Sequence, residues 1–178
     1  AFLCATIGLL TMKPKGETRA YAQIPEVMGG LCYEPVFANI CEFTRMANAK
    51  WDKSCGIELA DGVKLGDGKN ATANASKLAA IFENLRAYEA TLQGCDVDEI
   101  EKPYCLREWE NFRIAPEKTS TTILMTVAIR LDPFNIEQVR NLTSSNTLDL
   151  KDFGKKKDAL FLVIPPTDRT YNFLIAFL

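Results

Sequence analysis

Residues 155–168 have the sequence KKKDALFLVIPPTD. Three lysines and an aspartate precede six consecutive apolar residues, and two prolines end the run. A short, bounded and wholly apolar run is typical of a strand buried on both faces, as in a parallel sheet. Residues 170–178 are mostly apolar and have helical length, so we predict a strand, a turn and a helix, which together form half of a βαβ unit.

Upstream of this stretch almost nothing has the pattern of a strand. The predicted strand therefore lacks a partner within the chain, and we expect the chain to be a piece of a larger protein.

The composition excludes several classes of site. The chain has 178 residues, of which 47% are hydrophobic and 25% charged, and a net charge of −2. These values are ordinary for one soluble domain and provide no global attraction to nucleic acid. The absence of histidine excludes Ser-His-Asp and Cys-His catalysis and zinc sites that contain histidine. We therefore assign no catalytic, cofactor-binding or metal-binding residue.

The six cysteines form no C-x-x-C pair, which disfavours a structural zinc site. Cys4 and Cys41 lie among apolar residues, so we expect buried thiols at both positions. The chain is long enough to build a core without disulfides, and this favours a reducing cytoplasm.

Helical periodicity and helix-end signals predict a mainly α fold of roughly seven short helices. The strongest prediction is residues 72–93, with an apolar stripe at Leu78, Ile81, Phe82, Leu85, Tyr88 and Leu92 and with Gly94 as its end. Residues 51–70 are predicted to form a loop, although residues 50–59 could extend or restart a helix. The other predicted helices span residues 1–12, 24–31, 34–49, 105–112, 116–131 and 135–141, the last capped by Asn135.

The segment 116–131 has two interpretations. Its β-branched middle favours a strand on propensity, but it does not alternate. Ile123, Leu124, Val127, Ala128 and Leu131 fit one helical face, so we predict a helix. The domain boundary then falls between an all-α unit at 1–154 and the strand and helix of an α/β domain at 155–178.

Two loops superficially resemble known ligand-binding motifs, the P-loop and the EF-hand. The sequence GDGKNAT at residues 66–72 lacks the first glycine of a P-loop and has Asn70 where the Mg²⁺-binding hydroxyl would be, so we interpret it as a plain loop. The acidic residues of 96–101 lack the glycine and distal glutamate of an EF-hand and indicate a solvated turn.

Candidates for nucleic-acid binding are few. Arg107 and Arg113 lie near Trp109 in a mixture of basic and aromatic residues that single-stranded DNA-binding proteins use, although aromatic residues at this spacing more often belong to a core. These three residues are our only substrate-binding candidates. Lys155, Lys156 and Lys157 more often form a solvated edge, and Asp168 fits a helix cap better than a catalytic acid.

The sequence resembles a known family in its C-terminal third. The segment 128–134 (AIRLDPF), the L-x-L at 148–150 and the stretch 159–173 follow one another as in the conjugal-transfer coupling proteins, the TraG/TraD-like proteins of type IV secretion, particularly their Gram-positive branch. The apolar start at residues 1–10 is similar to a helix of that family. Residues 50–105 show no counterpart.

The resemblance implies a parent protein that is a membrane-anchored, hexameric, RecA-like ATPase using ATP and Mg²⁺. It also implies that the all-α unit is inserted in the nucleotide domain, faces the bacterial cytoplasm and recognises the relaxase-bound single-stranded DNA for a type IV secretion channel. Neither Walker motif lies in this chain, so we expect no ATP hydrolysis from it, and we expect the fragment to be a monomer.

Two other function classes remain open. One is a free-standing helical DNA-binding or protein-interaction domain, which would bind DNA in a salt-sensitive manner. The other is a cysteine- or acid-dependent hydrolase, which would lose activity on thiol alkylation.

Overall fold

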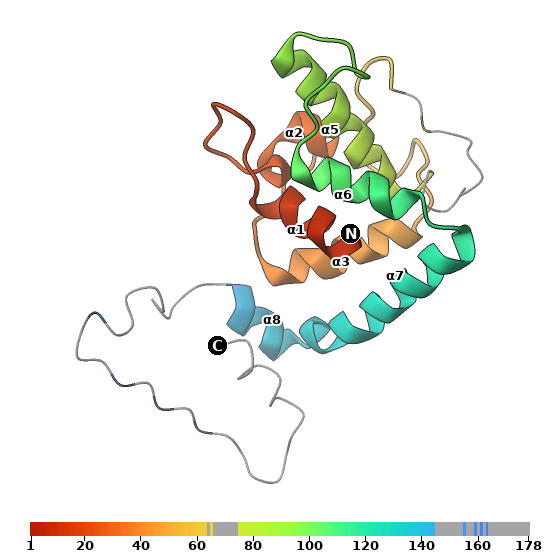
Figure 1. Ribbon diagram of the computed structural model, residues 1–178. Coiled ribbons are helices and arrows are strands. Elements are labelled where there is room, and N and C mark those ends of the chain that lie inside the picture. The colour runs from red at the N-terminus through yellow and green to blue at the C-terminus, as the bar shows by residue number, and fades with distance from the viewer. Residues whose placement is uncertain are drawn as a thin grey trace. The chain divides into compact units, whose positions relative to one another are not determined.

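The computed structural model describes residues 1–63, 65 and 75–144, together with positions 155, 159, 161 and 163. Its α-helices are α1 (Phe2–Thr11), α2 (Pro25–Met28), α3 (Phe37–Asn48), α5 (Lys77–Gln93), α6 (Tyr104–Arg113), α7 (Glu117–Leu131) and α8 (Glu137–Ser144) (Figure 1). Two 3-10 helices, η1 (Tyr21–Gln23) and η2 (Asp132–Asn135), join them. Within these described residues the extended pairing is limited to one isolated bridge between Lys50 and Ser76. The prediction of a mainly α fold is confirmed.

The chain divides into two compact units, Ala1–Ser145 and Asn146–Leu178. The fold that follows is that of the first unit. The predicted strand at 159–164 and the helix after it lie outside the described residues, apart from three isolated positions. They stay predictions, as does the boundary at residue 154.

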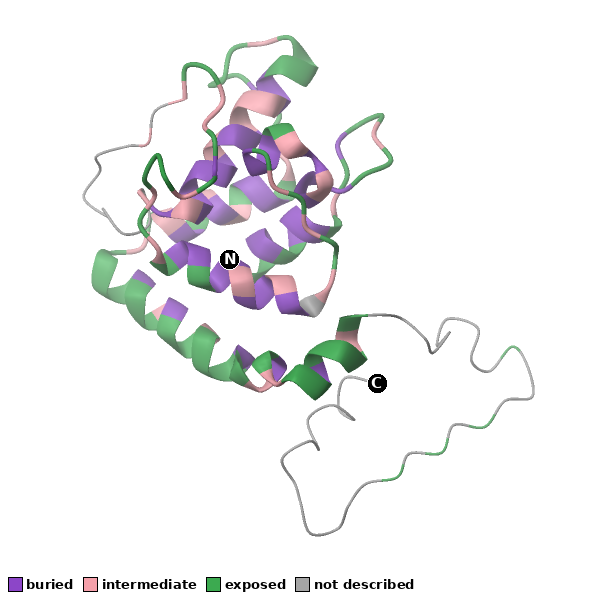
Figure 2. Ribbon diagram, turned by 180° about the vertical axis from the view of Figure 1, so that it is seen from behind, coloured by how far each residue is buried: buried purple, intermediate pink, exposed green. Residues whose placement is uncertain are grey.

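Helix α5 runs through the first unit and packs against α2, α3 and α6. Its apolar stripe supplies the centre of the core, where Phe82 stacks on Trp109 of α6 with ring centroids 4.5 Å apart and an interplanar angle of 9°. Figure 2 shows the buried residues on the inward faces of the packed helices. The predicted stripe is confirmed at Leu78, Ile81, Phe82 and Leu85, whereas Tyr88 is half-buried and Leu92 is exposed.

Helices α1 and α6 approach each other closely because of a glycine. A Cβ atom at Gly8 would lie 2.7 Å from Cys105 Cβ, so the side chain of Cys105 occupies the space that Gly8 leaves. Phe2 and Phe112 add a ring contact at 5.1 Å. The predicted helix at 1–12 is confirmed, whereas the prediction of a buried Cys4 is wrong, because Cys4 lies on the outer face of α1. The buried Cys41 is confirmed.

Both ends of α5 follow local rules. Ser76 is in an extended conformation and its hydroxyl accepts a 3.1 Å hydrogen bond from the Ala79 N–H, so it is the N-cap. The helix therefore begins at Lys77, and the predicted start at Thr72 was too early. Gly94 ends the helix in the left-handed conformation with a φ of 64°, as predicted.

The segment with two interpretations, 116–131, is a helix. Pro116 is the N-cap of α7, and the face that packs on α3 buries Ser120, Leu124 and Leu131. Ala128, predicted on the buried face, is exposed. The loop at 51–63 is also confirmed, without the alternative helix at 50–59.

Asn135 does not cap α8. It ends η2, and its side-chain oxygen accepts a 3.1 Å hydrogen bond from Arg45 of α3, so a tertiary contact replaces the predicted local one.

Two glycines in the same left-handed conformation allow a matched stability test. We expect Gly94→Ala to lower the free energy of unfolding by about 1 kcal/mol, the cost of a left-handed non-glycine residue, because its Cβ would meet open space. Gly29→Ala should cost about 3 kcal/mol or more, because its Cβ would lie 2.5 Å from the Glu58 carbonyl oxygen. Urea unfolding measures both values. Equal costs would contradict the close approach of the Glu58 backbone to the end of α2.

Candidate interaction surface

The three residues predicted to bind substrate have different environments. Trp109 is 1% exposed and lies in the core, so its ring is covered by Phe82 and Phe112 rather than presented for base stacking. Arg113 forms an ion pair of 2.5 Å with Glu83 of α5. Arg107 is exposed on α6. The structure therefore does not bring the three together as an aromatic and basic surface.

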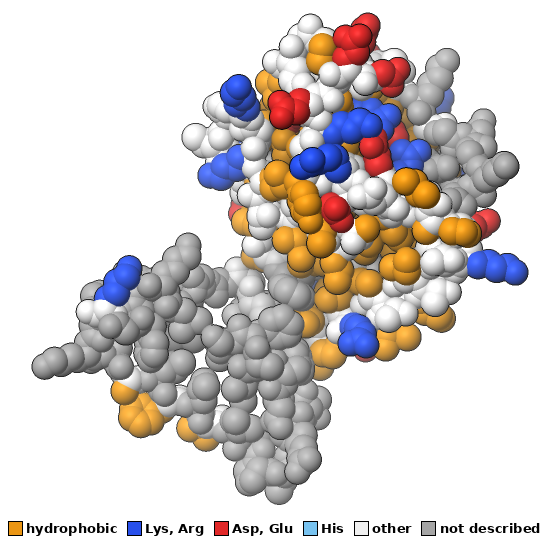
Figure 3. Space-filling model, viewed as in Figure 1, with side chains coloured by type: hydrophobic (Ala, Val, Ile, Leu, Met, Phe, Trp, Pro, Cys, Tyr) orange, Lys and Arg blue, Asp and Glu red, His pale blue; other side chains and the backbone are white. Residues whose placement is uncertain are grey.

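The charges above this core are paired. Arg86 of α5 contacts Glu110 of α6, and Lys102 lies 2.8 Å from the same carboxylate. Charged side chains of both signs gather on this part of the unit in Figure 3. Because Arg86, Lys102 and Arg113 each lie beside a carboxylate, these three cations contribute little net positive charge to attract phosphate.

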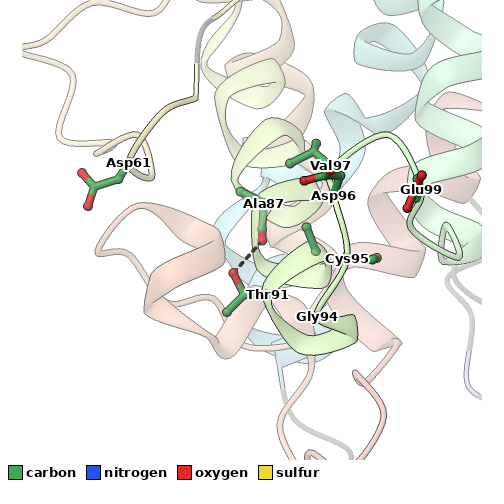
Figure 4. A pocket seen from close by; sticks show the side chains of 9 residues that line it. Asp61, Ala87, Thr91, Gly94, Cys95, Asp96, Val97 and Glu99 are labelled. Carbon is green, nitrogen blue, oxygen red and sulfur yellow. Dashed lines mark hydrogen bonds between the residues drawn. The ribbon is translucent and has the colours of Figure 1, made fainter.

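A hollow of about 650 Å³ lies beside the C-terminal end of α5. Its lining consists of one side of α5, the turn that follows and one residue from a distant loop. Figure 4 shows Asp96 and Glu99 on the turn, whereas Asp61 comes from the separate loop. The hydroxyl of Thr91 donates a 3.0 Å hydrogen bond to the Ala87 carbonyl within α5. The charged groups of the lining are the three carboxylates.

A hydrogen-bond network that runs from the surface to the buried Tyr21 holds the turn after α5. Gln93 binds Glu101 twice, because its side-chain oxygen accepts from the Glu101 N–H at 2.7 Å and its amide donates to the Glu101 carbonyl at 3.1 Å. The same amide donates to Glu89, whose other oxygen accepts a 2.5 Å hydrogen bond from the buried Tyr21 hydroxyl. The turn is thus anchored to the core through α5 and η1.

A second hollow of about 450 Å³ adjoins the first and shares Asp61, Ala87 and Thr91 with it. It adds the carboxylates of Glu17 and Glu26, and Arg19 lies 3.8 Å from Glu17. Burial, and then the negative charges of Glu17 and Glu26, raise the pKa of the Tyr88 phenol between them.

We name the two hollows together the acidic groove. It contains the carboxylates of Glu17, Glu26, Asp61, Asp96 and Glu99 and the guanidinium of Arg19. The sequence indicates only the cluster at 96–101. Four segments of the chain contribute to the groove, and no local spacing could reveal that they meet.

The acidic groove differs from a metal site. Among the described residues no group of three or more His, Cys, Asp or Glu side chains is arranged to hold a metal ion. Separated carboxylates along an open groove instead suit the spaced cations of a lysine- or arginine-containing segment of a protein.

The cysteines provide a test of the core. Burial raises the pKa of the Cys105 thiol to about 12 and also raises that of Cys41, so neither carries appreciable thiolate at pH 8. We expect iodoacetamide at pH 8 to label the exposed Cys4 and Cys32 first and to leave Cys41 and Cys105 unlabelled until the protein unfolds. Peptide mass spectrometry gives the rates. Labelling of Cys105 as fast as that of Cys4 would contradict the packing of α1 on α6.

The described helices include none with both the length and the apolar character needed to cross a membrane. A comparison with curated proteins found no match, and a comparison with solved structures found none either.

A family model described as type IV secretory system conjugative DNA transfer matches residues 52–178. The match includes the C-terminal stretches that carry the resemblance and also residues 52–105, for which no counterpart was apparent. It covers α5 to α8 and most of the acidic groove, while α1 to α3 lie outside it. The chain belongs to the family of type IV secretion proteins of conjugative DNA transfer.

Proposed function

We propose that the helical unit recognises the protein that accompanies transferred DNA, the relaxase, and presents it to a type IV secretion channel. The observation that carries this proposal is the family match over residues 52–178, which assigns the chain to conjugative DNA transfer. The acidic groove supports the finer assignment, because it is an open surface of net negative charge on a packed helical unit.

The charge of the groove favours a protein over bare DNA as its occupant. Phosphates are attracted by lysine and arginine, whereas the groove carries five carboxylates and one guanidinium. A basic segment of a relaxase would approach this surface with complementary charge, which increases the association rate and selects against acidic partners. Single-stranded DNA would then reach the channel as cargo attached to the relaxase.

The remaining parts of the proposal concern the parent protein. We place the helical unit on the cytoplasmic side of a bacterial membrane, next to the channel proteins, as part of a membrane-associated conjugation protein. ATP and Mg²⁺ would act in the nucleotide domain of that parent. We assign no hydrolysis to the residues of this chain.

Neutralising the groove tests the proposed surface. We expect the triple variant Asp61→Asn, Asp96→Asn and Glu99→Gln to bind the relaxase of the same conjugative element at least about tenfold more weakly, because three favourable charge interactions are lost. Isothermal titration at 50 and 200 mM salt measures the affinity. A 20-nucleotide single-stranded DNA without protein should bind neither the wild-type chain nor the variant.

A matched control removes the same number of charges elsewhere. Glu42→Gln, Asp52→Asn and Glu137→Gln lie outside the groove and should leave relaxase binding unchanged. Equal loss in both triple variants would show that net charge, rather than the groove, determines binding. Tight binding of bare DNA would favour the alternative of a helical DNA-binding domain.

A further inference from the structure

Helix α7 lies at the margin of the helical unit and is packed along one face only. That face contacts α3 and buries Ser120, Leu124 and Leu131. Figure 2 shows exposed residues along almost the whole length of the helix. A helix of 15 residues with one packed face leaves its opposite face to solvent or to a partner.

The outward face of α7 carries a regular stripe with the three- and four-residue spacing of a helix–helix contact. Met125 and Ile129, at its centre, are 66% and 68% exposed, which is unusual for side chains of this size. We name this face the α7 stripe. Its members are Lys118, Thr121, Thr122, Met125, Ile129 and Asp132.

The threonines of the α7 stripe contribute apolar surface. Thr121 Oγ1 donates to the Glu117 carbonyl at 2.9 Å, and Thr122 Oγ1 donates to the Lys118 carbonyl at 2.8 Å. Because both hydroxyls are satisfied within the helix, the threonines add methyl groups to the surface around Met125 and need no polar partner. The centre of the stripe is therefore apolar over about two helical turns.

The two ends of the α7 stripe carry opposite charges. Lys118 precedes Met125 by seven residues and Asp132 follows it by seven. Seven residues are about two helical turns, so Lys118 lies on the same face of α7 as Met125, and Asp132, the first residue of η2, directly continues the other end of that face. Both are exposed, and Asp132 accepts a 3.4 Å hydrogen bond from Asn135.

We propose that the α7 stripe binds the α7 stripe of a second copy of this chain, antiparallel and about a two-fold axis at Met125. In this arrangement Lys118 of each copy faces Asp132 of the other, and Met125 faces itself. A parallel pair would place lysine against lysine and aspartate against aspartate. The charge pattern thus selects the antiparallel pair, whose two halves are related as in other isologous dimers.

The proposed interface is small, so the pairing is weak. One pair of 15-residue helices buries less than the roughly 1,200 Å² of a stable interface, so we expect a dissociation constant between about 10 µM and 1 mM. The chain is then a monomer in dilute solution, as the sequence-based expectation has it, and pairs when it is concentrated. The inference is independent of the acidic groove and of the proposed relaxase binding.

Sedimentation equilibrium of the 178-residue chain from about 10 µM to 1 mM tests the pairing. Lys118→Glu and Asp132→Lys should each weaken association about tenfold, because each turns two attractive charge pairs into two repulsive ones. An equimolar mixture of these two variants restores both attractive pairs and should associate at least as well as the wild-type chain. The double variant, which exchanges the two charges, should also recover association.

Two further variants complete the design. Arg130→Glu reverses a charge on α7 away from the stripe and should leave association within about twofold of the wild-type value. Met125→Ser combined with Ile129→Ser should abolish association while circular dichroism shows an intact helix content.

Several outcomes would overturn the proposal. A wild-type chain that stays monomeric at 1 mM contradicts it directly. Single charge variants that associate like the wild type, or a mixture that fails to associate, contradict the antiparallel geometry. Association that survives Met125→Ser with Ile129→Ser would place the contact elsewhere, for example on the exposed Leu3 and Ile7 of α1.

Discussion

The stacked contact between Phe82 and Trp109 is the interaction on which the rest of the helical unit depends. It joins α5 to α6 at 4.5 Å, and both rings are almost completely removed from water. Helix α1 packs closely against α6, because Gly8 leaves room for the side chain of Cys105. Helix α5 also packs against α2 and α3, and α7 packs against α3. The other helices of the unit thus pack around these two buried aromatic rings.

The same contact explains why Trp109 is covered and why Arg113 is paired with a carboxylate. Packing α6 on α5 brings Arg113 to Glu83 and Arg86 to Glu110, so the cations are compensated by carboxylates across the helix pair. A net negative charge remains in the acidic groove, beside the C-terminal half of α5, where five carboxylates accompany one guanidinium. The distribution of charge is therefore a consequence of helix packing rather than of net composition, which is close to neutral.

Two surfaces of the unit differ in chemistry and hence in the partners that suit them. The acidic groove is polar, is built from four segments and suits a basic protein segment. The α7 stripe is apolar at its centre, follows α7 to the first residue of η2 and has opposite charges at its ends, which suits a copy of itself. The acidic groove is built beside α5, whereas α7 is packed on α3.

The sequence by itself determined the helices, the Gly94 end of α5 and the family, because periodicity, this end signal and the C-terminal motifs are local, whereas the Ser76 cap was recognised only in the structure. It could not determine which apolar residues would be covered. Leu92 and Ala128 have the same local pattern as their buried neighbours but are exposed, Ala128 at the edge of a small hollow beside α3. Only the tertiary structure brought Asp61 and Asp96 to one groove and left the α7 stripe exposed, because both features depend on contacts between residues distant in sequence.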